Sequence, residues 1–187
     1  MSNENQNWTN WLISTLNSTR YALIEPARLK YERFFNKIDY QNHSRFPLVS
    51  VCVPTYNRAS ILVNRAVKTV LSQSYKNLEL IIVGDHCTDN TSELLSKITD
   101  PRLKFYNLPS RRKNYNQTIE NHWLAGGANP ANVAMKMAKG DWIARVDDDD
   151  TWTIDHIEKL LEFAQYGNFE FVSALYEEER HGSREIV

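Results

Sequence analysis

A short apolar run at positions 78–83, Leu-Glu-Leu-Ile-Ile-Val, restricts the fold more than any other feature of this sequence. Its apolar residues are nearly continuous rather than alternating with polar ones, and the run is shorter than a typical helix. This pattern predicts a strand that is buried on both faces. Such strands belong to parallel sheets, because the connection between two parallel strands crosses the sheet and covers one of its faces with a helix.

Strand-like and helical segments alternate from Pro47 onward. A helix capped by Ser60 follows the first strand, and Gly140 is placed to end a later helix as its C-cap. The remaining strands are expected at residues 48–53, 103–106, 142–146 and 170–174, and the remaining helices at 91–98, 131–139 and 154–165. Residues 47–187 are therefore predicted to form an α/β domain with a mainly parallel sheet flanked by helices.

The first 46 residues contain no strand-like run and are rich in aromatic side chains. Pro26 can open a helix at its first position, and a shorter helix is expected before it, around Trp8, Trp11, Leu12 and Leu16. Helical spacing gives the second helix one apolar face, made of Ala27, Tyr31, Phe34, Phe35 and Ile38. We expect a helical extension whose face packs on the main domain. A contact with a second copy, giving a homo-oligomer, or with a membrane surface is the alternative.

Composition narrows the class of protein. The 187 residues are 42% hydrophobic and carry a formal net charge of -1, which favours a folded domain and argues against a nucleic-acid partner. Cys52 and Cys87 both follow strand positions and are expected to be buried thiols rather than a disulfide. The sequence has neither a signal-peptide pattern nor about 18 consecutive apolar residues, so a cytoplasmic location is expected.

Polar residues follow three of the predicted strands, at the edge where open α/β sheets bind their ligands. The first strand ends in Pro54-Thr55-Tyr56-Asn57-Arg58, the second in Gly84-Asp85-His86, and a later one in four consecutive aspartates, 147–150. Four adjacent carboxylates repel one another, and Mg²⁺ or Mn²⁺ among them would relieve that repulsion. On an extended backbone Asp147 and Asp149 would point to one side and share the metal.

Four blocks of this sequence resemble family 2 glycosyltransferases in order and spacing. They read VSVCVPTYNR, LELIIVGDHCTDNT, DPRLKFY and AKGDWIARVDDDDTW, and the resemblance covers about residues 47–175. It implies a GT-A fold, a Rossmann-like domain that binds a nucleoside-diphosphate sugar. The implied reaction is transfer of the sugar to a glycan or other acceptor with inversion at the anomeric carbon.

The resemblance also implies roles for single residues. Asp149 matches the metal-binding aspartate of the DxD motif, with Mn²⁺ or Mg²⁺ as cofactor, and Asp147 its first aspartate, near the ribose. Asp85 matches the acidic residue that hydrogen-bonds the base, usually uracil, so a UDP-linked donor is expected; uracil has an imide N–H to donate and cytosine has none there. The donor-nucleotide site is completed by the matching positions Pro54, Thr55, Tyr56, Asn57, Arg58 and Asp148.

The sequence departs from its relatives in three places. Gly84 stands where many have a further aspartate, and Pro130-Ala131-Asn132 lacks the arginine that many have. The trio Arg111, Arg112 and Lys113 is expected to be a solvated charged run, and its alternative role is to replace that diphosphate contact. The family's acceptor half and catalytic base lie in tens of residues after the DxD strand. The sequence given ends at Val187 and residues 177–179 look like a solvated acidic run, so we expect both to be missing from it.

No catalytic base is therefore assigned, and two further functions stay open. One is a non-catalytic module that binds a nucleotide sugar or a partner protein. The other, a sugar-nucleotide pyrophosphorylase, is disfavoured because residues 54–58 lack the Gly-rich loop that it needs. His86 beside Asp85 is expected to be a loop residue, and Trp152 either lines the sugar pocket or packs in the core.

Overall fold

The computed structural model describes residues 18–35, 44–111, 127–180 and 183–186, together with positions 8, 12, 15 and 16. The chain forms two compact units, Met1–Asn42 and His43–Val187. No helix in the described part of the chain is long and apolar enough to cross a bilayer.

In the first unit a π-helical turn, η1 (Arg20–Ile24), leads directly into α2 (Glu25–Phe35). Pro26 therefore lies inside a continuous helical segment instead of opening a helix, which corrects the expectation. The wider π-helical turn stands just before Pro26, where the proline ring lacks an N–H and crowds the preceding turn. Tyr31, Phe34 and Phe35 are exposed and contact one another along α2, whereas Trp11 and Ile38 lie outside the described residues. Contact of this face with a second copy stays a prediction.

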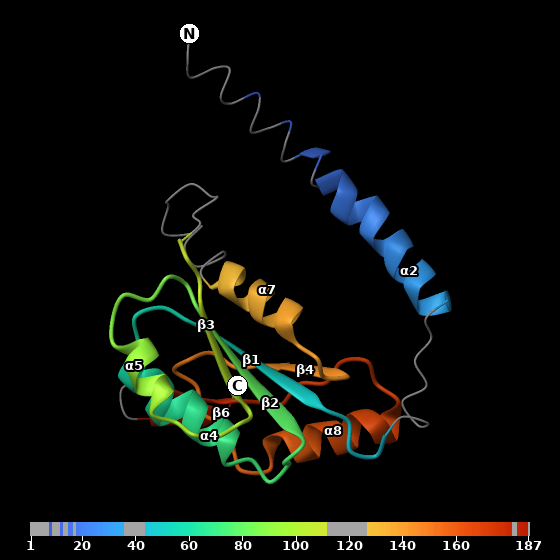
Figure 1. The fold of residues 1–187 in the computed structure, drawn as a ribbon. Helices are drawn as coiled ribbons and strands as arrows, with labels where there is room; N and C mark the ends of the chain where they lie inside the picture. Colours follow the sequence, from blue (N-terminus) through green and yellow to red (C-terminus); the bar gives the residue numbers. More distant parts are fainter. Residues whose placement is uncertain are drawn as a thin grey trace. The chain divides into compact units, whose positions relative to one another are not determined.

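The second unit is built on a parallel sheet in the order β3-β2-β1-β4 (Figure 1). Its strands are β1 (Val49–Thr55), β2 (Leu78–Gly84), β3 (Leu103–Asn107) and β4 (Trp142–Arg145). Val49 pairs with Leu78 on one side and with Trp142 on the other, so β1 is central. Every residue of β1 and β2 is buried, which confirms the expectation drawn from the apolar run.

Helices cover both faces of this sheet (Figure 1). One face carries α7 (Ala128–Met137), and the other carries α8 (His156–Gly167), α5 (Thr91–Ser96) and a continuous helical stretch made of α3 (Ala59–Leu62), η2 (Val63–Val67) and α4 (Lys68–Leu71). Ser60 does not cap that stretch: the N–H of Ala59 donates to Oδ2 of Asp89 at 3.2 Å. The cap comes from the loop after β2, which sequence spacing could not reveal.

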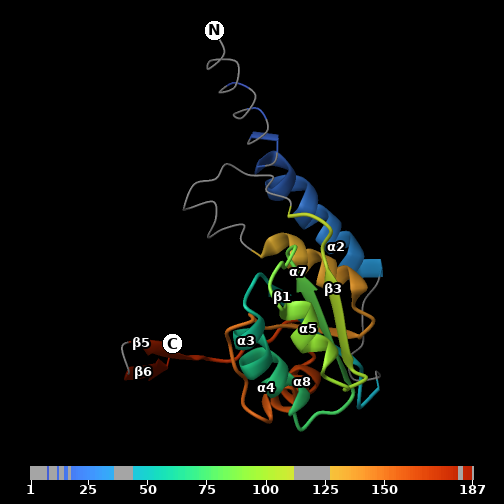
Figure 2. The ribbon, with the colours of Figure 1, turned by 60° about the vertical axis from the view of Figure 1, so that its left-hand side comes forward.

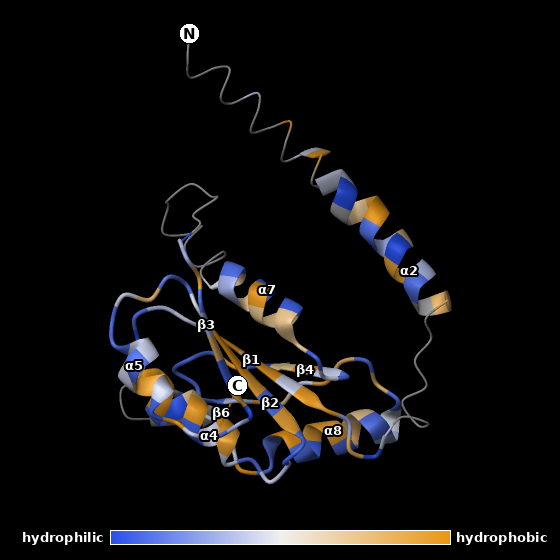
Figure 3. Ribbon diagram, viewed as in Figure 1, coloured by the Kyte–Doolittle hydropathy of each residue, from blue (hydrophilic) through white to orange (hydrophobic). Residues whose placement is uncertain are grey.

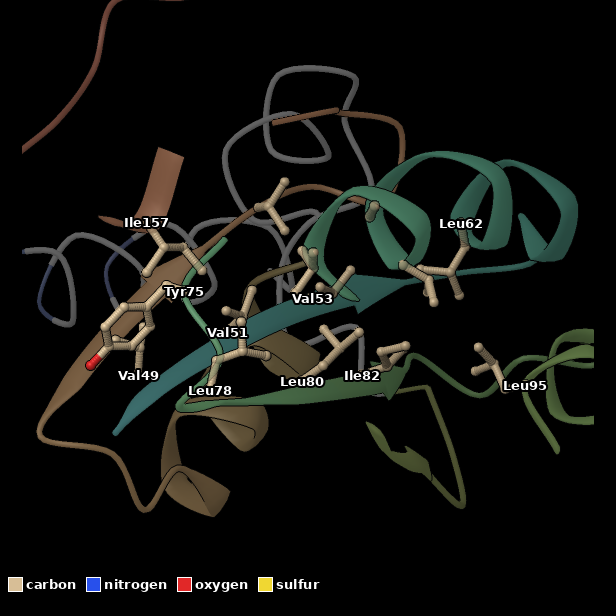
Figure 4. Close-up of a cluster of buried hydrophobic side chains, with 14 of the residues drawn as sticks. Val49, Val51, Val53, Leu62, Tyr75, Leu78, Leu80, Ile82, Leu95 and Ile157 are labelled. Atoms are coloured by element: carbon tan, nitrogen blue, oxygen red, sulfur yellow. The ribbon is translucent and has the colours of Figure 1, made fainter. Parts of the chain in front are cut away.

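Each face of the sheet has its own apolar core. The larger cluster joins one face of β1 and β2 to the helices that cover it, and Figure 4 shows its central members Val51, Leu80, Ile82 and Leu62. The smaller cluster contains Cys52, Ile81, Val83, Leu108 and Ala134 and lies under α7. Figure 3 shows hydrophobic residues concentrated along the central strands. Cys52 is buried, Cys87 is only partly buried, and both are free thiols.

A carboxylate is buried in the second strand. Glu79 accepts hydrogen bonds from Ser50 at 2.6 Å, from the Lys139 N–H at 2.7 Å and from the Lys104 ammonium at 2.6 Å. Burial alone would raise its pKa, but these hydrogen bonds together lower it below the ordinary value. The Gly140 N–H donates to Ser50 Oγ at 2.8 Å, and α7 already ends at Met137, so Gly140 is a close contact with β1 and not the expected C-cap.

The segment after α8 differs from its prediction. Residues 170–174 form no strand and are mostly exposed. The next strands are β5 (Glu177–Arg180) and β6 (Ser183–Ile186), an antiparallel pair in a sheet of its own (Figure 2). Residues 177–179 are thus part of a strand rather than the expected helical or loop run. The sequence 170–174 has the composition of a strand but no neighbour in the sheet with which to pair.

Candidate functional site

The carboxyl ends of β1, β2 and β4 bring three of the expected site residues together. The Asp85 N–H donates to the Thr55 carbonyl at 2.8 Å, which continues the β1–β2 pairing past the end of the strands. On the other side of β1, Thr55 Oγ1 donates to Asp148 Oδ2 at 2.7 Å, which joins the end of β1 to the segment after β4. The strand order reverses between β1 and β4, and in open α/β sheets this is the point at which ligands bind.

Asn57 joins the loop after β1 to the loop after β2. Its backbone has a φ of 50°, in the left-handed region that asparagine tolerates better than most residues. Its Oδ1 accepts hydrogen bonds from the N–H groups of Thr88 at 2.8 Å and Asp89 at 3.4 Å. The side chain thus serves the protein itself, and its donor-binding role stays a prediction.

Asp85 is buried and half satisfied. Its Oδ2 accepts a hydrogen bond from Arg111 Nε at 2.8 Å. Its Oδ1 is buried and has no hydrogen-bond partner among the described residues. A buried carboxylate oxygen without a donor costs free energy on the order of 1–3 kcal/mol, so this atom is poised to accept a hydrogen bond from a ligand.

The Arg111 guanidinium lies over the ring of Tyr56, with its carbon 3.7 Å from the ring centroid. Arg111 thereby connects the loop after β3 to those after β1 and β2. The sequence left Arg111 as either part of a solvated charged run or a candidate diphosphate contact, together with Arg112 and Lys113, which lie outside the described residues. In this structure Arg111 instead belongs to the surroundings of Asp85.

Asn107, at the end of β3, was missed as a residue that shapes this edge. Its Oδ1 accepts a hydrogen bond from the Cys87 N–H at 2.8 Å, and its Nδ2 donates to the Cys87 carbonyl at 2.8 Å. A Cβ added at Gly84 would lie 2.6 Å from Asn107 Oδ1. Gly84 therefore leaves room for the side chain that holds the Asp85 loop. A polar residue ending a strand was the available signal, since the same reasoning selected Thr55 and Asp85.

The four aspartates 147–150 do not continue β4, because that strand ends at Arg145. They form a turn in which the Asp150 N–H donates to the Asp147 carbonyl at 3.2 Å. The alternation of an extended strand does not apply in a turn, so the extended backbone from which Asp147 and Asp149 were expected to share a metal is not present. Asp147 is paired with Arg145 at 3.2 Å, and Asp148 and Asp149 converge instead.

Arg58 is the point on which those two carboxylates converge. Its Nη1 lies 3.2 Å from Asp148 Oδ1 and 2.8 Å from Asp149 Oδ2. The negative charge of Asp148, followed by that of Asp149, raises the pKa of Arg58 against the opposing effect of burial. Arg65 donates from Nη1 to the Asp149 carbonyl at 2.8 Å. It lies seven residues, two helical turns, after Arg58, a spacing that could have identified it.

Asp150, Trp152 and His86 have different surroundings. The pKa of Asp150 is raised, first by desolvation and then by the negative charges of Asp149 and Asp147, although much of its side chain meets solvent. Trp152 stacks on His156 with ring centroids 4.5 Å apart and packs against the larger core cluster. This favours the packing role of Trp152. His86 has a φ of 62° and its Nδ1 lies 3.2 Å from the Leu108 carbonyl, as suits a loop residue.

The donor set fits a divalent cation held jointly with a ligand. Among the described residues no three His, Cys, Asp or Glu side chains are arranged to hold a metal. Two carboxylates, those of Asp148 and Asp149, do share one cationic nitrogen, that of Arg58. Mg²⁺ is commonly bound through one or two carboxylates with the phosphates of a substrate completing its shell. The residues present match that arrangement.

Comparison with known proteins agrees with this geometry. Residues 50–186 match the sequence model of the family described as Glycosyl transferase family 2. UDP-Glc:alpha-D-GlcNAc-diphosphoundecaprenol beta-1,3-glucosyltransferase WfaP of Escherichia coli is 35% identical over 118 residues, which cover 63% of this chain and 41% of that protein. Hyaluronan synthase of Pasteurella multocida is 32% identical over 126 residues, covering 66% and 11%. The chain thus spans less than half the length of these curated relatives.

Solved structures show the same fold. TarS of S. aureus, in complex with UDP, has a TM-score of 0.54 and 25% identity over 64% of this chain and 32% of that one. Mannosyltransferase PcManGT from Pyrobaculum calidifontis, in complex with GDP-Man and Mn²⁺, has a TM-score of 0.52 and 21% identity over 80% and 42%. The second likeness concerns the fold alone. Together with the parallel sheet, these neighbours confirm the expected GT-A fold.

Proposed function

Because the chain belongs to glycosyl transferase family 2, we propose that it binds a nucleoside-diphosphate sugar at the carboxyl edge of its sheet for inverting transfer of the sugar to a glycan or other acceptor. UDP is the proposed nucleotide. The relative WfaP is named for a UDP-glucose donor, and TarS was solved with UDP.

The observation that carries this proposal is the buried Oδ1 of Asp85, which has no hydrogen-bond partner in the part of the chain that the structure describes. The imide N–H of uracil would supply the donor that this oxygen lacks. In uracil that N–H is flanked by two carbonyl oxygens, and the Arg111 guanidinium, bonded to the other oxygen of Asp85, would offer N–H groups to one of them. Cytosine has a ring-nitrogen acceptor in place of that N–H, so in the same position it would leave Asp85 without a donor.

The ring of Tyr56 supports the Arg111 guanidinium, which is stacked on it. A guanidinium stacked on an aromatic ring is held in one orientation at little cost in hydration, because arginine is weakly hydrated compared with lysine. With Arg111 fixed on Tyr56 and paired to Asp85, the donor and acceptor groups for the base are in place before it binds. Such preorganisation lowers the entropy cost of binding.

The diphosphate is proposed to lie toward Asp148 and Asp149. A bound Mn²⁺ or Mg²⁺ would neutralise charge on the diphosphate leaving group. Asp149, half exposed, would hold it with the buried Asp148, whose orientation Thr55 fixes. Arg58 stands beside both carboxylates as a further cation. Asp147, paired with Arg145, is proposed near the ribose.

Titration calorimetry tests the base-recognition proposal. We expect UDP to bind more tightly than CDP in the wild-type protein with Mn²⁺, and Asp85→Asn to lose about ten- to a hundredfold in UDP affinity, the scale of a hydrogen bond to a charged group. Asp141→Asn, which changes an exposed aspartate just before β4, is the matched control. Equal UDP affinity in wild type and Asp85→Asn would refute the role of Asp85. Equal affinity with Mn²⁺ and with EDTA would refute that of the metal.

A further inference from the structure

The Arg58 guanidinium lies between the two carboxylates that are proposed to hold the cation. Its Nη1 bridges Asp148 Oδ1 at 3.2 Å and Asp149 Oδ2 at 2.8 Å. The second oxygen of Asp148 is already engaged by Thr55 at 2.7 Å. Asp148 Oδ1 and Asp149 Oδ2, the two oxygens that converge, are therefore both held by Arg58.

We propose that Arg58 is a built-in counterion that occupies the divalent-cation position while no donor is bound and leaves it when cation and diphosphate arrive together. This inference rests on the proposed function and deepens it. Carboxylate oxygens bind Mg²⁺ at about 2.0–2.1 Å, so the same pair of oxygens cannot hold Arg58 Nη1 and a cation at once. The two states exclude each other.

The exposure of the three side chains suits such an exchange. The side chain of Asp148 is 8% exposed, whereas the side chains of Arg58 and Asp149 are 50% and 47% exposed. An ion pair between two half-exposed groups is weak, because water screens both charges. The contact of Arg58 with Asp149 can therefore be broken at small cost, and the buried Asp148 stays as the fixed ligand, because the arriving cation replaces the charge that Arg58 withdraws.

The released guanidinium has a partner only when the nucleotide is present. The diphosphate brings two or more negative charges next to the cation, and a guanidinium pairs well with phosphate oxygens. If the cation bound without nucleotide, the displaced Arg58 guanidinium would lie beside a metal ion and would have no phosphate with which to pair. Cation and nucleotide should therefore strengthen each other's binding. By thermodynamic linkage, each raises the affinity for the other by the same factor.

The test is Mn²⁺ binding to the nucleotide-free protein, followed by the electron paramagnetic resonance signal of free Mn²⁺. We expect Arg58→Gln to bind Mn²⁺ about three- to tenfold more tightly than wild type, the scale of a half-exposed ion pair that the cation no longer has to break. Arg65→Gln is the matched control. It removes the same charge seven residues further along the chain, and the hydrogen bond of Arg65 goes to the Asp149 carbonyl instead of to a carboxylate oxygen of Asp148 or Asp149.

The outcomes separate occupancy from general electrostatics. Unchanged or weaker Mn²⁺ binding by Arg58→Gln would overturn the inference, and so would an equal gain in Arg65→Gln. Absence of Mn²⁺ binding in every variant would also overturn it. Arg58→Lys, which keeps the charge but cannot span both carboxylates in the same way, should fall between wild type and Arg58→Gln and serves if the glutamine variant fails to fold. UDP binding to the same samples reports separately on the proposed function.

Discussion

Thr55 Oγ1 donates a 2.7 Å hydrogen bond to Oδ2 of Asp148, and this bond joins the end of β1 to the turn after β4. Both residues are buried, at 4% and 6% exposure. The bond fixes which oxygen of Asp148 is left facing Arg58. It therefore sets the orientation of the buried half of the proposed cation site.

Thr55→Val should weaken UDP binding in the presence of Mn²⁺ by about tenfold, because a buried carboxylate would lose a hydrogen bond to a charged group. Valine keeps the shape of threonine, so packing changes little. Calorimetry with UDP and Mn²⁺ measures the effect, and Thr55→Ser, which retains the hydroxyl, should restore most of the affinity. A valine variant with wild-type affinity would show that the bond does not orient the site.

Arg111→Gln should narrow the difference in affinity between UDP and CDP. The glutamine loses the ion pair with Asp85 and the stack on Tyr56, so the donor beside the Asp85 carboxylate is no longer held in place. We expect UDP affinity to fall about tenfold and CDP affinity to change less. Tyr56→Phe keeps the aromatic face beneath Arg111 and should retain the selectivity. Equal losses for both nucleotides would place Arg111 on the diphosphate, the alternative that the sequence left open.

The fold was predictable where the sequence pattern reflects burial. Leu78–Gly84 is buried along its whole length, and only the middle of a layered parallel sheet offers that environment. The strand expected at 170–174 was wrong, since strand composition does not specify a pairing partner. Ser60 failed as a cap for a related reason. Asp89, which receives the first N–H of α3, lies 30 residues away in the sequence.

The candidate site was predictable as a set of strand ends and less so as a set of contacts. Parallel topology was sufficient to bring Thr55, Asp85 and Asp148 to one edge. Asp149 shares Arg58 with Asp148 and not with Asp147. This depends on where β4 ends, which is one residue earlier than expected. The contacts of Arg111 and Arg58 depend on the direction of long side chains across loops, which no spacing rule specifies.

Asp89→Ala should lower the free energy of unfolding by about 1–2 kcal/mol, the usual cost of removing a helix cap. One carboxylate serves two helices: Oδ2 accepts from the Ala59 N–H at 3.2 Å and Oδ1 from the Thr91 N–H at 3.1 Å. Urea unfolding followed by circular dichroism gives the value. Asp89→Asn keeps an acceptor and should lose less. If both variants were as stable as the wild-type protein, the cap would contribute nothing to stability.

Glu79 should make stability depend on pH in the acid range. Hydrogen bonds from Lys104, Ser50 and Lys139 outweigh the opposing effect of burial and lower its pKa in the folded protein, whereas the unfolded value is about 4.3. A lowered folded-state pKa gives stabilisation that is complete above the unfolded pKa and is lost as pH falls through the folded one. Glu79→Gln should therefore cost about 2–3 kcal/mol at pH 7, and less as the pH is lowered below about 4.

Urea unfolding of wild type and Glu79→Gln between pH 3 and pH 7 measures this difference. Glu93→Gln is the matched control, because Glu93 also pairs with a lysine, Lys97, at 2.7 Å, but both side chains are more than 60% exposed. An exposed pair contributes about 0–1 kcal/mol, so that variant should follow the wild-type curve closely. A constant gap between Glu79→Gln and wild type across the whole pH range would mean that the loss comes from packing and not from the ionised carboxylate.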